Sequence, residues 1–320
     1  MTFESVSVVV PCYNSEASLP LLLEQLLPVL EAEVDRAEVI LVNDDSRDGT
    51  WNAITQLAGM YPNVRGVNLM RNYGQHNALL CGIRAARGEV VITMDDDLQH
   101  PPEEIRPLLS KLAEGYDVVY GTPQREQHGI WRDMASQMTK LALQSAMGTD
   151  IARSVSAFRV FRTQLRDAFA DYSSPFVNID VLLTWATKRF AAVPVRHDAR
   201  TIGVSNYTFK KLLTHAVNMI TGFSVLPLQL ASYVGFGTML FGVVILIYVL
   251  VRYVINGGSV PGFPFLASMI AIFSGVQLFV VGIFGEYLAR MYQRTMNRPI
   301  YTVRDEVGGP VAQAVEAEQL

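Results

Sequence analysis

The sequence predicts an α/β protein that is anchored in a membrane. Its first two thirds alternate short β-branched runs with apolar-periodic stretches of about ten residues or more, which is typical of a mostly parallel sheet covered by helices. Clusters of polar residues follow successive strands. The last third contains two long runs without a charged side chain. Together these features predict a Rossmann-like domain followed by a transmembrane hairpin of two helices.

Short runs rich in Val and Ile predict the strands, and apolar residues that recur with helical spacing predict the helices. In chain order, the expected elements are strand 6–10, helix 17–34, strand 37–42, helix 50–61, strand 64–69, helix 75–86, strand 90–94, helix 102–114 and strand 118–121. In such a sheet a ligand binds beyond the carboxyl ends of the strands. The loops PCYN, NDDS, RNYG and DDDLQ follow four of these strands and therefore predict one binding site at that edge.

Composition limits the function classes. The chain has 320 residues and a formal net charge of −4, so no global basic field points to nucleic acid. A dinucleotide-dependent dehydrogenase is disfavoured because no G-x-G-x-x-G follows the first strand. The two cysteines, Cys12 and Cys81, argue against a disulfide framework and fit a reducing compartment. The N-terminus has Glu4 in place of a basic region and is not expected to be a signal peptide.

Three consecutive carboxylates, Asp95, Asp96 and Asp97, follow the strand predicted at 90–94. Their mutual repulsion can be offset by a divalent cation or by backbone donors. If the segment is extended, Asp95 and Asp97 lie on one face and can hold Mg²⁺ or Mn²⁺ that carries a diphosphate. Alternatively, the three acids form a loop that caps the helix beginning near Pro102. The triplet alone leaves both interpretations open.

The motifs PCYNSEASL, VNDDSRDGT, RNYGQHNALLCG and MDDDLQHPPEE resemble those of the GT-A glycosyltransferases of family two, in particular those that use polyisoprenyl phosphate. The resemblance implies a GT-A catalytic domain that binds a nucleotide-sugar donor. It also implies a divalent metal site made by Asp95, Asp97 and Gln99. The donor-binding residues that it implies are Pro11, Tyr13 and Asn14 at the base and ribose, Asn43 and Asp44 at the nucleobase, and the acidic residues Asp95 and Asp96.

The chain departs from the family pattern at three positions. The motif P-x-Y-N-E ends here in Ser15, so the contact of its glutamate is not carried over. Relatives often have G-D-F-R where this chain has Ala157 before Phe158, which removes a candidate general base. Pro123 stands where relatives often have arginine. Loss of the base argues against an alcohol acceptor but not against a phosphate, whose second pKa of about 6 leaves its oxygen anionic at neutral pH.

Four arginines are candidates for binding an acceptor phosphate, because a guanidinium group bonds two oxygens at once and keeps its charge. Arg159 lies in an apolar stretch, which predicts burial against an anion. Arg125, Arg132 and Arg200 lie near loop-forming residues and could equally be surface or salt-bridged side chains. Together with Asp97, these arginines form the predicted catalytic set.

The last third predicts a membrane anchor. Residues 216–251 and 253–285 contain no Asp, Glu, Lys or Arg, and each run exceeds the roughly 20 residues that span a bilayer. We place the two spans near 229–251 and 263–285. The cationic residues on the outer flanks predict that both ends face the cytoplasm. These residues are Lys210, Lys211, Arg290, Arg294 and Arg298.

The predicted organisation has four segments: a catalytic domain at 1–206, an interfacial helix at 207–225, a transmembrane hairpin at 226–286 and a cytoplasmic segment at 287–320. The pattern at 207–223 suits the surface of an anionic membrane, although a core helix has a similar pattern. The stretch GEYLARMYQRTMNRPIYTVRD again resembles the polyisoprenyl-phosphate glycosyltransferases. It could return to the catalytic domain or to a neighbouring subunit, since the resemblance implies a homo-oligomer. The residues after Gly308 are expected to be disordered.

The resulting hypothesis is a membrane-bound glycosyltransferase that moves one sugar from a UDP- or GDP-sugar to undecaprenyl or decaprenyl phosphate. The reaction would take place at the cytoplasmic face of the inner membrane, and the resemblance implies inversion at the anomeric carbon. Two alternatives remain at this point. A processive polysaccharide synthase usually has more spans and a Q-x-x-R-W motif, which this sequence lacks. A non-catalytic membrane scaffold would bind nucleotide sugar without turnover.

Overall fold

The computed structural model describes residues 3–123, 151, 154–174, 176–198, 226–256, 262–296 and 298–309. The chain divides into two compact units: Met1–Leu212 together with Arg298–Leu320, and Leu213–Asn297. The first unit thus joins segments from both ends of the chain, and it includes Arg298–Leu320 from the segment predicted at 287–320. The interfacial helix predicted at 207–225 lies outside the described residues.

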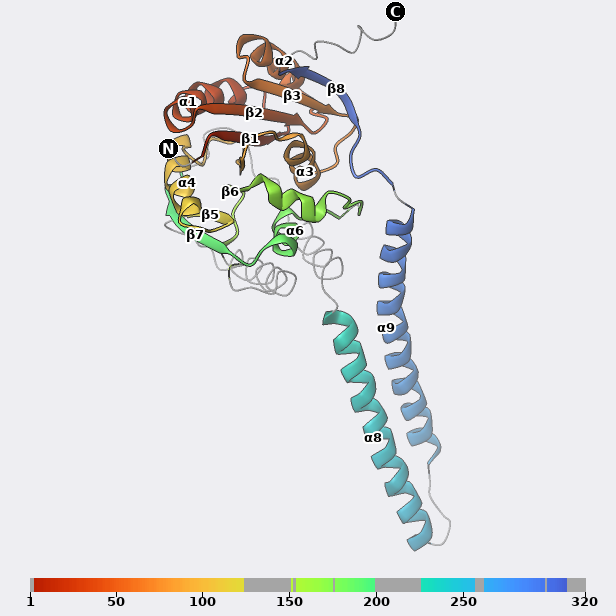
Figure 1. The fold of residues 1–320 in the computed structure, drawn as a ribbon. Coiled ribbons are helices and arrows are strands. Elements are labelled where there is room, and N and C mark those ends of the chain that lie inside the picture. Colours follow the sequence, from red (N-terminus) through yellow and green to blue (C-terminus); the bar gives the residue numbers. More distant parts are fainter. Residues whose placement is uncertain are drawn as a thin grey trace, which may run out of the picture. The chain divides into compact units, whose positions relative to one another are not determined.

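One sheet forms the centre of the first unit, as Figure 1 shows. Among the described residues its strand order is β7-β5-β6-β4-β1-β2-β3-β8. The neighbours β4, β1, β2 and β3 are parallel, whereas β6 and β8 run antiparallel to the strands beside them. The strands are Ser5–Cys12 (β1), Arg36–Asn43 (β2), Val64–Leu69 (β3), Val90–Thr93 (β4), Val118–Pro123 (β5), Arg159–Arg162 (β6), Phe190–Val195 (β7) and Val303–Gly308 (β8). The predicted α/β architecture is confirmed.

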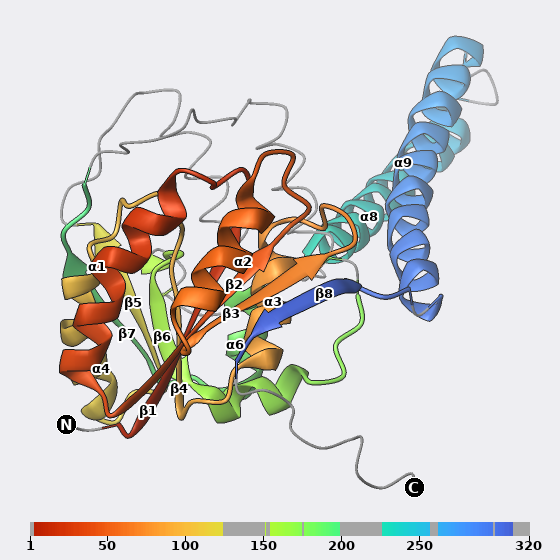
Figure 2. The ribbon, with the colours of Figure 1, turned by 90° about the horizontal axis from the view of Figure 1, so that it is seen from above.

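Helices cover both faces of the sheet. Successive residues of a strand point to opposite faces, and the strands are apolar on both, so each face needs a covering layer. In β1, Val8 and Val10 join the core under α1, α2 and α4, while Val9 joins the core under α3 and α6. Figure 2 shows the first of these helical layers from above. The helical segments are Ser18–Glu33 (α1), Thr50–Met60 (α2), Gln75–Ala85 (α3), Pro102–Glu104 (η1), Ile105–Ala113 (α4), Thr163–Phe169 (η3) and Ile179–Ala186 (α6).

The predicted elements between residues 6 and 121 agree with the structure to within a few residues at each end. Three strands that follow them, β6, β7 and β8, were not predicted. In β8 the sequence VRDEVG places exposed charged side chains along an edge strand, where they protect the edge but give no apolar signal. The strand is recognisable only through its partner, β3, with which it pairs across most of the length of the chain.

The second unit contains two long helices, Leu226–Asn256 (α8) and Phe263–Thr295 (α9). Both are long and apolar enough to cross a membrane, with candidate spans at Pro227–Ile255 and Ile272–Thr295 and mean hydropathies of 2.5 and 1.6. A β-carbon added at Gly242 would come within 3.1 Å of the Phe273 ring, so the two helices are in contact. The predicted hairpin of two apolar helices is therefore confirmed, and each predicted span lies within a helix.

Both cysteines are free thiols in the core. Burial raises the pKa of Cys12 well above its usual value and raises that of Cys81 to about 12. Because the thiolate is the reactive form of cysteine, we expect iodoacetamide at about pH 8 to leave both thiols unmodified in the folded protein. Both should be alkylated after denaturation, as intact-mass spectrometry can measure. Equally fast labelling of the folded and denatured protein would contradict this assignment.

Candidate active site

The loops after β1, β2, β3 and β4 line one pocket at the carboxyl edge of the sheet. The pocket has a volume of about 510 Å³ and receives residues from all four loops. The expectation that these four polar loops share one site therefore agrees with the structure. The lining residues are Pro11, Cys12, Tyr13, Asp44, Asn72, Gly74, Gln75, Asp95, Asp96 and Asp97.

Hydrogen bonds hold the loop after β1 against the turn after β2. The backbone N–H of Tyr13 donates to Ser15 Oγ at 3.0 Å, and about half of the Tyr13 side chain is exposed, at 45%. Asn14 has a φ of 56°, in the left-handed region that asparagine tolerates better than most residues. Its Oδ1 accepts a hydrogen bond from the backbone N–H of Arg47 at 2.9 Å. The P-x-Y-N segment is thus fixed before any ligand binds.

Asp44 organises the loop after β3. Its two carboxylate oxygens accept hydrogen bonds from the backbone N–H groups of Tyr73 and Gly74, at 2.7 Å and 2.8 Å. Burial raises the pKa of Asp44, and the two N–H donors act in the opposite direction. Gly74 permits this geometry because it has a φ of +92°, which residues with a β-carbon rarely adopt. Asp44 therefore shapes the wall of the pocket in addition to lining it.

Asn43 is buried and is not one of the lining residues. Its Oδ1 accepts hydrogen bonds from the backbone N–H and the hydroxyl of Ser46, at 3.3 Å and 2.5 Å. Its Nδ2 donates to Asn68 Oδ1 at 2.8 Å. The structure thus gives Asn43 a supporting role, in which it fixes the turn where a nucleobase contact was predicted.

The acidic triplet reaches the pocket, but not through the predicted extended conformation. β4 ends at Thr93, and a bend follows in which Leu98 has a φ of 58°. Strand alternation therefore does not turn Asp96 away from its neighbours, and all three carboxylate residues line the pocket. The expectation that only Asp95 and Asp97 share a face is corrected on this point, because the strand ends before the acids begin.

Neighbouring polar groups contact Asp95 and Asp97. Gln75, the first residue of α3, donates from Nε2 to Asp95 Oδ1 at 2.7 Å. The backbone N–H of Gln99 donates to Asp97 Oδ1 at 3.2 Å. No role was predicted for Gln75, although the RNYGQ motif includes it. Gln75 begins α3, whereas the acids follow β4, so the acidic motif alone could not reveal this contact.

Ser15 and Asp96 join the loops after β1 and β4, since the Ser15 hydroxyl donates to the Asp96 carboxylate. The pKa of Asp96 is raised to about 6, chiefly by burial and also by the charge of Asp97, while the Ser15 hydrogen bond acts in the opposite direction. Ser15 occupies the position of the glutamate in P-x-Y-N-E. In this chain the Ser15 side chain instead binds the carboxylate of Asp96, on the loop after β4.

Asp95 and Asp97 offer carboxylate oxygens, the ligands that Mg²⁺ and Mn²⁺ prefer. Among the described residues, no group of three His, Cys, Asp or Glu side chains is arranged to hold a metal ion. Any cation here would need further oxygens from a ligand or from water, as is usual for Mg²⁺ on a phosphate. The donor set fits a metal–diphosphate complex better than a closed site made of protein ligands.

Gln99 was predicted to complete the metal site, but it is not among the lining residues. The side-chain Nε2 of Gln99 donates to the backbone carbonyl of Asp198 at 3.4 Å, and the backbone carbonyl of Gln99 accepts the backbone N–H of Asp198 at 2.9 Å. The structure therefore uses Gln99 to join the loop after β4 to the segment after β7.

Arg159 was predicted to hold the acceptor phosphate, and this prediction is corrected. The side chain is buried, with 2% exposed, and its guanidinium forms an ion pair with Asp180 at the start of α6. Its Nε also donates to Thr93 Oγ1 at 3.0 Å. The Tyr120 hydroxyl donates to the same Asp180 oxygen at 3.0 Å. Burial against an anion was therefore predicted correctly, but the anion belongs to the protein. No sequence pattern indicated Asp180 as the partner of Arg159.

The other three predicted arginines, Arg125, Arg132 and Arg200, lie outside the described residues. Their predicted role at an acceptor phosphate consequently remains a prediction.

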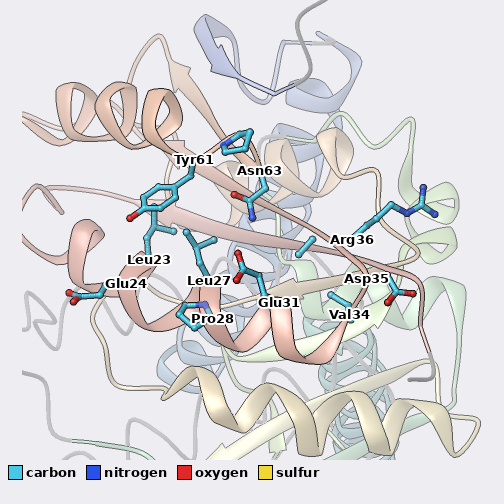
Figure 3. A pocket seen from close by; sticks show the side chains of 12 residues that line it. Leu23, Glu24, Leu27, Pro28, Glu31, Val34, Asp35, Arg36, Tyr61 and Asn63 are labelled. Atoms are coloured by element: carbon cyan, nitrogen blue, oxygen red, sulfur yellow. The ribbon is translucent and has the colours of Figure 1, made fainter.

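A second hollow, of about 680 Å³, lies near the amino ends of β2 and β3 (Figure 3). The side chains of Leu23, Leu27 and Tyr61 line it together with the carboxylates of Glu24 and Glu31. None of the four polar loops contributes to it. Because ligands of open α/β sheets bind at the carboxyl ends of the strands, the smaller pocket with the acidic triplet is the better candidate.

Residues 7–172 match the family described as Glycosyl transferase family 2. The chain belongs to this family. It is 34% identical to an undecaprenyl-phosphate 4-deoxy-4-formamido-L-arabinose transferase from Shewanella sediminis, over 95% of this chain and 93% of the relative. It is 37% identical to a transferase of the same name from Pseudomonas aeruginosa, over 93% of this chain and 89% of the relative. The resemblance to the polyisoprenyl-phosphate glycosyltransferases is confirmed, and the protein is a glycosyltransferase.

A solved structure supports the fold. The glucosyl-3-phosphoglycerate synthase of Mycobacterium tuberculosis, crystallised with Mn²⁺ and UDP, aligns with a TM-score of 0.51. The alignment covers 68% of this chain and 78% of the synthase, at 19% sequence identity. At this identity the similarity establishes the GT-A-like fold of the family 2 domain alone.

Proposed function

We propose that this family 2 glycosyltransferase moves a single sugar from a nucleotide-sugar donor to a polyprenyl phosphate at the membrane surface. The observation that carries the proposal is the convergence of four polar loops on one acidic pocket, in a chain that also has two helices long enough to cross a membrane. The relatives named above are undecaprenyl-phosphate transferases and match over nearly their whole length. Their sugar, 4-deoxy-4-formamido-L-arabinose, is therefore the first candidate for transfer here.

The pocket suits the diphosphate of the donor. Asp95 and Asp97 would hold a divalent cation, Mg²⁺ or Mn²⁺, which neutralises charge on the leaving nucleoside diphosphate. Pro11, Tyr13 and Asn14 would contact the base and ribose, next to the turn that contains Asp44. Two observations support these contacts: the resemblance of the motifs to those of the family, and the position of Pro11, Tyr13 and Asp44 in the lining of one pocket.

The chemistry needs no general base at the acceptor. An oxygen of the lipid phosphate, already anionic at neutral pH, attacks the anomeric carbon, and the bond from that carbon to the diphosphate oxygen breaks. Direct displacement inverts the anomeric configuration. Ala157, where relatives often have an aspartate, is compatible with this acceptor. Arg125, Arg132 and Arg200 are proposed to bind the lipid phosphate as bidentate donors.

Connectivity supports a location of both ends of the hairpin on one side of the membrane. The segments up to Leu212 and from Arg298 onward belong to the same compact unit, and a hairpin of two crossings returns the chain to the side from which it left. Arg290, Arg294 and Arg298 lie at the end of the hairpin and favour the cytoplasmic side. We propose an integral protein of the inner membrane that works as a homo-oligomer.

The deciding experiment supplies the purified protein with undecaprenyl phosphate and a panel of UDP- and GDP-sugars, including UDP-4-deoxy-4-formamido-L-arabinose. We expect one sugar per lipid in the chloroform-extractable product, measured by mass spectrometry, and loss of that product in EDTA with recovery on adding Mg²⁺ or Mn²⁺. A product that grows in length would favour a processive synthase. Nucleotide-sugar binding without nucleotide release under the same conditions would favour a scaffold.

A further inference from the structure

We propose that β8, the strand that follows the membrane hairpin in the chain, positions the donor-binding loops of the pocket. The inference rests on the proposed use of a nucleotide-sugar donor. β8 pairs antiparallel with β3, so its first residues lie at the carboxyl edge of the sheet, where the pocket is. Two neighbouring residues of β8, Arg304 and Asp305, contact the elements that carry these loops.

Asp305 begins a row of hydrogen bonds that crosses the sheet. Its Oδ2 accepts from Asn68 Nδ2 at 3.3 Å on β3, and Asn68 Oδ1 accepts from Asn43 Nδ2 at 2.8 Å on β2. Asn43 Oδ1 accepts from the Ser46 hydroxyl at 2.5 Å, and Ser46 Oγ accepts the backbone N–H of Asn14 at 3.0 Å. We call these five residues the edge ladder. It links the strand after the hairpin to the P-x-Y-N loop.

The charge of Asp305 gives the edge ladder its direction. An ionised carboxylate can only accept hydrogen bonds, so it requires Asn68 to present its NH₂ group. The carbonyl of Asn68 then faces Asn43, which must in turn present its own NH₂ group and leave its carbonyl for Ser46. Without a pure acceptor at position 305, either amide could rotate by half a turn. The turn after β2 would then lose the acceptor that holds Ser46.

Arg304 contacts the loop after β3 and the turn after β2 from a bulge in β8. The register between β3 and β8 shifts between Asn68 and Leu69, which leaves Arg304 as the additional residue of a bulge. Bulges redirect a side chain that regular pairing would place elsewhere. Arg304 Nη2 donates to the carbonyl of Met70 at 2.9 Å, and its Nη1 lies 4.0 Å from Asp45 Oδ1. Arg304 therefore connects the loop after β3 with the turn after β2, beside Asp44.

The test measures binding of UDP and GDP to the full-length protein with Mn²⁺ by calorimetry, and the KM and kcat for the sugar donor. We expect Asp305→Ala to weaken nucleotide binding and to raise the donor KM by about fivefold, the equivalent of one net hydrogen bond. The kcat and the KM for undecaprenyl phosphate should change little. Arg304→Ala should act in the same direction. Asp305→Asn can accept from Asn68 but can also donate, so it no longer sets the direction of the ladder and should recover only part of the affinity.

Glu306→Ala is the matched control, because Glu306 also carries an exposed negative charge on β8 but is not part of the edge ladder. It should bind UDP and GDP as the wild type does. Melting temperatures within about 4 °C of the wild type would exclude a general loss of stability. If Asp305→Ala melts lower than that, Arg304→Ala decides the outcome.

Wild-type nucleotide affinity in both Asp305→Ala and Arg304→Ala would overturn the inference. A wild-type protein that binds UDP or GDP but transfers no sugar to undecaprenyl phosphate would instead overturn the proposed function. The two results are distinguishable because nucleotide binding is measured without the acceptor.

Discussion

Asp97→Asn is expected to lower sugar transfer to undecaprenyl phosphate by about a hundredfold to a thousandfold, the loss that follows removal of one electrostatic stabiliser of a transition state. Asparagine has nearly the same shape but no negative charge, so it binds a divalent cation more weakly at the diphosphate. Asp97 lines the pocket beside Asp95 and Asp96. Its Oδ1 accepts the backbone N–H of Gln99, and the backbone carbonyl of Gln99 accepts the backbone N–H of Asp198. The initial rate of lipid-linked product formation at saturating donor measures the effect.

The control for this variant is Asp171→Asn, because Asp171 is an exposed carboxylate that does not line the pocket. Both variants should insert into membranes as the wild type does, since neither changes the apolar helices. Raising the Mn²⁺ concentration should recover part of the activity of Asp97→Asn. Unchanged turnover of Asp97→Asn at every metal concentration would remove Asp97 from the proposed metal site.

Asp180→Ala is expected to destabilise the first unit by about 3–5 kcal/mol, because it leaves the positive charge of Arg159 buried without its partner. The two side chains are only 2% and 5% exposed, so water cannot replace the lost carboxylate. The Tyr120 hydroxyl loses its acceptor as well. For a unit of this size the change corresponds to a melting temperature lower by about 10 °C. Thermal unfolding of the purified protein in detergent measures it.

Two comparisons separate the buried charge from the loss of a contact. The double variant Arg159→Met with Asp180→Leu should recover part of the stability, because neither charge is then left alone, although the Tyr120 hydroxyl still lacks its acceptor. Glu4→Ala breaks the exposed pair with Arg36, whose side chains are 81% and 73% exposed, and should cost less than about 1 kcal/mol. A melting temperature of Asp180→Ala equal to that of Glu4→Ala would contradict the buried-pair interpretation.

Much of the fold and part of the site were predictable, because their signals are local. β-branched runs and helical spacing depend on neighbouring residues, and they placed the elements between residues 6 and 121. The rule that parallel strands bring their carboxyl ends together then placed Pro11, Asp44 and Asp95 at one pocket. Two uncharged apolar runs likewise predicted α8 and α9 without knowledge of their packing.

Pairing across long separations was decided by the tertiary structure. Arg159 was expected to meet a ligand, but packing of α6 against the sheet gives it Asp180. An extended segment would have placed only Asp95 and Asp97 on one face, but β4 ends before these acids and Ser15 binds Asp96. The charged segment VRDEVG carried no strand signal, yet it joins β3 through contacts between residues 237 positions apart.

The sequence by itself determined the order of the elements between residues 6 and 121, the edge of the sheet at which the pocket lies and the presence of two membrane-length helices. These properties follow from side-chain periodicity, which is a property of short segments. Only the tertiary structure decided which polar groups become partners. A hydrogen bond or ion pair forms between whichever groups the packed chain brings within about 3 Å of each other, and separation along the chain does not reveal that distance.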